Sequence, residues 1–258
     1  MTWEDDQKHP FAGIAEKLDR AHQNIVNLNS EITVFFERCK YPVVPNPDSQ
    51  EWQDAVDYHR SLQFPLRWSV LSGEVVHHLR SCLDHIVWHF SCDTYRQEHE
   101  NAIEFPVLRE LPSPKDKSRV YDRKIKGITK TEVLQRIEDM QPYKRGSDAG
   151  DDPLCIVHDM DRFDKHRELV IVRARANLFF PPGTSVDVVR SIARRDQGEP
   201  ITDAEWALAR RAIKHDAVVL PQVAFAKFGE RKDQPIFPSL VQLHKAVVER
   251  VDLFAVLV

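Results

Sequence analysis

One stretch of the chain, residues 67 to 91, carries an unusual set of side chains that could do acid–base chemistry. It includes Arg80, the two carboxylates of Glu74 and Asp84, and the four histidines His77, His78, His85 and His89. Histidine can both accept and donate a proton near neutral pH. Arg80 and Asp84 are four residues apart, so they can pair on a helix. On a helical projection these polar residues share one side, so we expect either a buried polar network or a site that uses Arg80 and His85.

A metal site is a second interpretation of the same face. Glu74, His78, His85 and His89 fall within about 60° of one another on an ideal helix, so they form a stripe of possible ligands. Metal sites in helical bundles usually take ligands from several helices. This stripe is therefore an alternative, and the main prediction names no cofactor.

A second polar cluster ends the helix expected between residues 153 and 166. Its last residues are Asp164, Lys165, His166 and Arg167. These charges could simply complete a solvated helix end, where cations favour the C-terminal dipole. The functional alternative is that Asp164 and His166 face Arg80 and His85 and complete one site.

Hydrophobic periodicity predicts a mainly helical α+β fold. We expect a helical bundle at residues 1–166, with a short extended or hairpin excursion at 40–64 where prolines gather. A β-rich subdomain is expected at 167–237, and a C-terminal helix at 238–258 should return to the bundle. The expected strands of a small antiparallel sheet are 169–172, 178–180, 186–189 and 218–228.

Composition excludes several classes of protein. The 258 residues have a formal net charge of −4 and only eight glycines, so neither a global basic field nor a glycine-rich nucleotide fold is indicated. There is no apolar run of about 18 residues. The four cysteines are scattered, which predicts a reduced, cytoplasmic protein.

Several short motifs resemble those of a group of uncharacterised bacterial proteins. They are Leu79-Arg80-Ser81-Cys82-Leu83-Asp84-His85, Gln141-Pro142-Tyr143 and Asp164-Lys165-His166-Arg167, in this order. That resemblance implies no activity.

Arg80-x4-His85 also resembles the R-x4–6-H signature of HEPN ribonucleases, helical proteins of toxin and anti-phage defence systems that usually act as dimers. The resemblance implies metal-independent cleavage of RNA by a homodimer or with a partner protein. His85 would be the general acid or base, Arg80 would stabilise phosphorus-centred charge, and Asp84 and Ser81 would orient them.

An RNA substrate needs a basic approach surface, and residues 109–130 supply one with a net charge of +5. The RNA-binding candidates are Arg119, Arg123, Lys124, Lys126, Lys165 and Arg167. A solvated loop would explain the same polarity. Two further functions stay open: a metal-dependent hydrolase on the histidine face, and a non-enzymatic bundle that binds a partner.

Overall fold

The computed structural model describes residues 7–39, 49–166, 172–179, 183–196, 198–216, 218–225 and 234–258. It divides into two units. Unit 1 comprises residues 1–30, 66–171 and 236–258, and unit 2 comprises residues 31–65 and 172–235. Helix α1 contributes to both. The predicted mainly helical class is confirmed.

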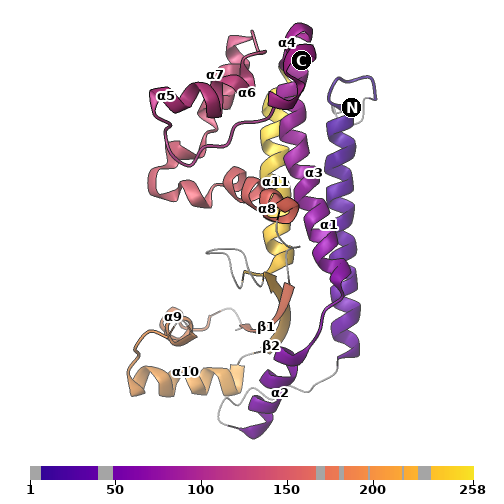
Figure 1. Cartoon of the computed structure of the whole chain (residues 1–258). Coiled ribbons are helices and arrows are strands. Elements are labelled where there is room, and N and C mark those ends of the chain that lie inside the picture. Colours follow the sequence, from indigo (N-terminus) through magenta and orange to yellow (C-terminus); the bar gives the residue numbers. More distant parts are fainter. Residues whose placement is uncertain are drawn as a thin grey trace. The chain divides into compact units, whose positions relative to one another are not determined.

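Four long helices make up the framework of unit 1. They are α1 (Ala12–Arg38), α3 (Leu66–Phe90), α8 (Pro153–His166) and α11 (Ile236–Ala255). In Figure 1, α3 lies between α1 and α11, and α3 and α11 each contact α8. The apolar stripes of the sequence form the core: Leu79, Leu83, Ile86, Leu28, Leu240, Val247 and Phe254 are all fully buried.

Short elements cover one end of this framework. Along the chain they are α4 (Asp93–His99), η2 (Glu100–Ala102), α5 (Pro114–Lys117), η3 (Ser118–Asp122), α6 (Arg123–Ile125), α7 (Thr131–Asp139) and η4 (Pro142–Asp151). An extended segment, residues 103–108, runs between η2 and the helical stretch that α5 begins. Residues 114–125 are therefore helical and not a loop, and most of their charged side chains are exposed, as the solvated alternative expects.

Unit 2 pairs β1 (Val172–Phe179) with β2 (Val218–Phe225) in antiparallel register, Val172 opposite Phe225. Helix α2 (Gln50–Ser61) contacts β1, and Phe64 packs against Phe35 with ring centroids 5.4 Å apart. The excursion predicted at 40–64 is thus helical over α2, because its prolines flank this helix instead of interrupting it. Residues 40–48 lie outside the described ranges.

Two helices separate the paired strands: α9 (Val186–Asp196) and α10 (Asp203–Asp216). The strand predicted at 186–189 is wrong, because these residues begin α9. The valines of this segment lie in one helix, and two of them, Val186 and Val189, are exposed on its outer side. Of the other predicted strand positions, 169–171, 180 and 226–228 lie outside the described residues.

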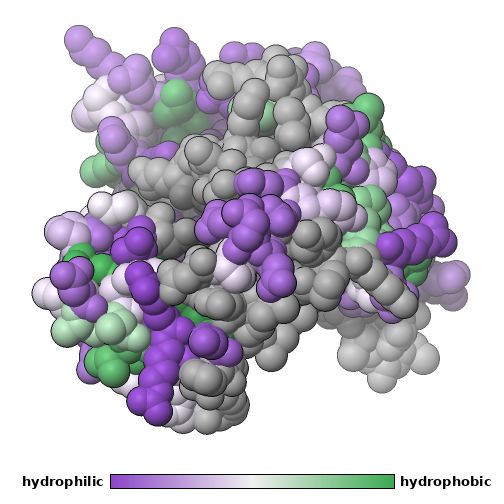
Figure 2. All heavy atoms as spheres, turned by 90° about the horizontal axis from the view of Figure 1, so that it is seen from below, coloured by the Kyte–Doolittle hydropathy of each residue, from purple (hydrophilic) through white to green (hydrophobic). Residues whose placement is uncertain are grey.

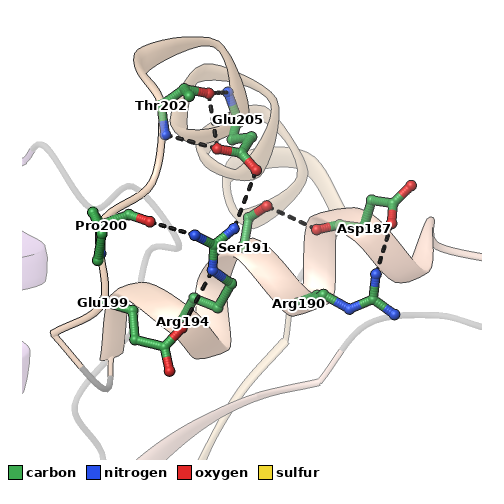
Figure 3. A network of polar contacts seen from close by, with 8 residues as sticks. All are labelled: Asp187, Arg190, Ser191, Arg194, Glu199, Pro200, Thr202 and Glu205. Atoms are coloured by element: carbon green, nitrogen blue, oxygen red, sulfur yellow. Dashed lines mark hydrogen bonds and ion pairs between the residues drawn. The ribbon is translucent and has the colours of Figure 1, made fainter.

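The turn between α9 and α10 is held by side chains, as Figure 3 shows. Arg194 pairs with Glu199 and Glu205 and donates to the carbonyl of Pro200. Thr202 and Glu205 form a reciprocal capping box at the start of α10, since each accepts a hydrogen bond from the main-chain N–H of the other. Figure 2 shows the chain from below the view of Figure 1. On the face seen there, small groups of hydrophobic residues lie among hydrophilic ones.

Candidate active site

Helix α3 presents its predicted apolar side to the core. Its polar residues lie in two different environments. Val75, Leu79 and Ile86 have no exposed surface. Arg80 is 3% exposed, whereas His85 is an exposed residue. Five residues along a helix correspond to about 140° around its axis. Within one chain, the structure therefore does not bring Arg80 and His85 into a common site.

Arg80 and Asp84 instead hold the backbone of Phe105, an arrangement called the backbone clamp below. Arg80 Nη2 lies 2.8 Å from Asp84 Oδ1, as the i, i+4 spacing predicts. The same Nη2 donates to the carbonyl oxygen of Phe105 at 2.8 Å, and Asp84 Oδ1 accepts from the Phe105 N–H at 2.8 Å. Both polar groups of one buried peptide residue are thus satisfied by one ion pair.

Gln141 fixes the other end of the extended segment. Its side chain is 1% exposed. Nε2 donates to the carbonyl of Pro106 at 2.9 Å and to that of Ile137 at 3.0 Å, while Oε1 accepts from the Leu108 N–H at 3.1 Å. The Gln-Pro-Tyr motif therefore has a structural role: it holds residues 106–108 against α7.

The held segment presents Glu104 to two cationic side chains and a histidine. The Glu104 side chain is 43% exposed, and its carboxylate forms an ion pair with Lys124 of α6. Arg80 Nη2 lies 3.7 Å from the other carboxylate oxygen. His158, half-buried on α8, is close enough for the charges of Arg80, Lys124 and Glu104 to affect its pKa. We call Glu104, Lys124 and His158 the Glu104 site.

Burial and the neighbouring charges together set the protonation of the Glu104 site. Burial, and then the positive charge of Arg80, lower the pKa of His158, although Asp159 opposes them. Burial pushes the pKa of Glu104 up, but the hydrogen bond and charge of Lys124, with Arg80, outweigh it and lower the pKa overall. At pH 7 the site therefore combines a mainly neutral imidazole with an ionised carboxylate that is paired with Lys124.

The negative charge of Asp84 is only partly stabilised within the clamp. Burial raises the pKa of Asp84, and the Arg80 charge and the Phe105 N–H only partly offset it. Arg80 Nη1 is buried and has no hydrogen-bond partner among the residues that the structure describes. Removing either member of this ion pair would leave the other charge poorly compensated.

The stripe proposed as a metal site faces α1 instead of a common centre. Glu74 accepts a hydrogen bond from Asn24 at 3.0 Å, and the His89 ring packs edge-on against Phe11 with centroids 5.3 Å apart. Lys17 of α1 lowers the pKa of both His78 and His85, after burial. In the ranges that the structure describes, no three potential ligands gather to hold an ion. These four residues are spread over about 22 Å of the helix, too far apart to bind one ion together.

The charged end of α8 packs against an earlier turn of α3. A Cβ on Gly73 would lie 2.7 Å from Asp164 Oδ2, so glycine makes room for this carboxylate. One turn on, His77 Nδ1 lies 3.1 Å from Asp161, which also pairs with Lys165 at 2.7 Å. Gly73 precedes Arg80 by about 10 Å along the helix, so Asp164 does not join the clamp. The side chain of His166 and the whole of Arg167 lie outside the described residues.

The remaining predicted residues lie at the surface or take other partners. Arg119, Arg123 and Lys126 are exposed, and Ser81 is half-buried. Sequence reasoning missed Glu104 and His158 as members of a site. A usable signal was a carboxylate immediately before Phe105-Pro106, in a short extended segment between helices.

Among the described helices, none combines the length and apolar content needed to cross a bilayer. Comparison of the chain with family models, curated proteins and solved structures found no match. The chemistry of the Glu104 site therefore follows from its own residues: a proton acceptor, a carboxylate and a cation held at the edge of a rigid segment.

Proposed function

We propose that this chain is a metal-independent ribonuclease whose chemistry takes place at the Glu104 site. The observation that carries the proposal is the Lys124–Glu104 ion pair, with Arg80 Nη2 3.7 Å from Glu104 and the half-buried His158 near enough for these charges to act on it. The proposal keeps the reaction expected from the Arg80-x4-His85 resemblance and assigns its proton transfer to His158 instead of His85. RNA is the substrate because the 2′-hydroxyl supplies a nucleophile next to the phosphorus.

In this mechanism His158 acts as the general base. Its neutral imidazole takes the proton of the 2′-hydroxyl, and the 2′-oxygen attacks phosphorus. The bond to the 5′-oxygen breaks, and the imidazolium returns the proton to that oxygen. The products are a 2′,3′-cyclic phosphate and a 5′-hydroxyl.

The charged neighbours stabilise the states that form along this path. Lys124 offers an ammonium group to the phosphate oxygens, on which negative charge develops. Glu104 raises the proton affinity of His158, so it stabilises the imidazolium. Arg80 is a positioning residue: with 3% exposure it contacts the segment that carries Glu104, not the substrate.

Cleavage of an end-labelled RNA by purified variants tests the proposal. His158→Ala should lower kcat about a hundredfold to ten-thousandfold, and Glu104→Gln and Lys124→Met should also impair it. His22→Ala, an exposed histidine on α1, is the matched control. A chelator should leave the rate unchanged, since no step uses a metal.

Three results would contradict the proposal. Wild-type protein that cleaves no RNA would favour a non-enzymatic binding role. Loss of activity in His85→Ala, with His158→Ala unaffected, would restore the original Arg80/His85 assignment. Inhibition by the chelator, reversed by added metal, would favour a metal-dependent hydrolase.

A further inference from the structure

A short helical stretch beside the Glu104 site has one buried and one cationic side. Elements α5, η3 and α6 follow one another without a gap from Pro114 to Ile125. Ser113 caps the first of them by accepting a hydrogen bond from the Asp116 N–H at 3.3 Å. Tyr121 and Ile125, 4% and 6% exposed, anchor the buried side. The stretch is therefore a fixed platform for the residues on its outer side.

Three cations form a row on that outer side: Lys115, Arg119 and Arg123, named the cation row below. All three are exposed. In a regular α-helix, residues four apart drift by about 40° per step. The π-helical turn η3, over Ser118–Asp122, is wider and counteracts this drift. The local geometry thus keeps the three cations in line.

The side chains of the cation row make no hydrogen bond or ion pair with other described residues. Of the two carboxylates on the stretch, Asp116 accepts a hydrogen bond from Ser113 Oγ at 2.6 Å. Side chains that stay unpaired on a fixed helix are suited to bind a repeating anion.

The row ends beside the catalytic residues. Lys124 follows Arg123 directly and turns to the flank of the helix, where it pairs with Glu104. A chain of phosphates bound along the row would therefore meet the Glu104 site at its end.

We infer that the cation row binds the phosphate backbone of single-stranded RNA and leads it to the Glu104 site. This inference rests on the proposed function. The row spans about 12 Å, enough for a few phosphates of one strand, whereas modules that read duplex RNA by shape span about 16 base pairs. Contacts to phosphates alone carry no sequence information, so binding should not depend on base sequence.

Fluorescence anisotropy with a labelled 2′-O-methyl oligoribonucleotide, which cannot be cleaved, tests the row. The variant combines Lys115→Gln, Arg119→Gln and Arg123→Gln. For single strands, each phosphate contact contributes about 0.7 to the salt slope, so three contacts give about 2. Between about 50 and about 200 mM salt, wild-type affinity should fall about 18-fold more than that of the variant.

The control combines Arg211→Gln, Lys214→Gln and Lys245→Gln, three exposed cations on α10 and α11. It removes the same charge and should keep the wild-type slope. The inference would be overturned if wild type and row variant had equal salt slopes, or if the control lost as much of the slope as the row variant. Tighter binding of a duplex of the same sequence would also overturn it. Absence of RNA cleavage would refute only the proposed function, because this binding assay needs no catalysis.

Discussion

Replacing Arg80 with methionine tests the backbone clamp most directly. The change keeps much of the apolar stem but removes the charge that compensates Asp84 and the donor that satisfies the Phe105 carbonyl. Breaking a buried ion pair from one side costs about 3–5 kcal/mol, and the low end applies here because the Asp84 side chain is 32% exposed. With about 2–4 °C per kcal/mol for a chain of this size, a cost near 3 kcal/mol lowers Tm by about 6–12 °C.

Urea denaturation followed by far-UV circular dichroism measures this loss. Arg119→Met, the same change at an exposed position of unit 1, should leave the midpoint unchanged. Adding Asp84→Leu to Arg80→Met should recover part of the loss, because the uncompensated carboxylate is then absent.

The pH dependence gives a second check. Burial already raises the pKa of Asp84 above its unfolded value, and loss of Arg80 should raise it further. A carboxyl group with a raised pKa favours folding once it is protonated. The stability deficit of Arg80→Met should therefore shrink as the pH falls through the folded pKa of Asp84. A loss below about 1 kcal/mol, or a double variant less stable than the single, would refute the clamp.

Three further predictions concern other positions. Gly73→Ala alone should not stabilise the protein, because its Cβ would lie 2.7 Å from Asp164; in an Asp164→Ala background the same change should gain about 1 kcal/mol of helix propensity, measured by urea denaturation. Burial lowers the pKa of His78 and of His244, whose Nε2 lies 3.0 Å from the Leu18 carbonyl. Folding therefore favours their neutral forms, and thermal melts should show stability falling as the pH drops from about 6.5 through their folded pKa values. Burial likewise lowers the pKa of His158, so RNA cleavage should rise with pH through a pKa below its ordinary value and then level off; a rate that falls with pH there would contradict its role as base.

Local information was enough for the helices that carry the core. Apolar residues at three- and four-residue steps predicted α3 and α11, because burying such a stripe is the main source of helix stability in a protein. The Asp84–Arg80 pair followed from the same periodicity. Short segments were harder: β-branched residues at 186–189 form the start of α9, since propensity is a weak guide when packing decides.

The candidate site shows the limit of that information. Residue spacing alone indicated the apolar face of α3 and the pairing of Arg80 with Asp84. Packing between distant segments is needed to place Phe105 on this pair, Glu104 on Lys124 and His158 near them. These contacts join residues 20 to 80 positions apart in the chain, and helical periodicity constrains only neighbours within a few turns. Burial, which sets the protonation of His158, likewise depends on what the whole chain packs against it.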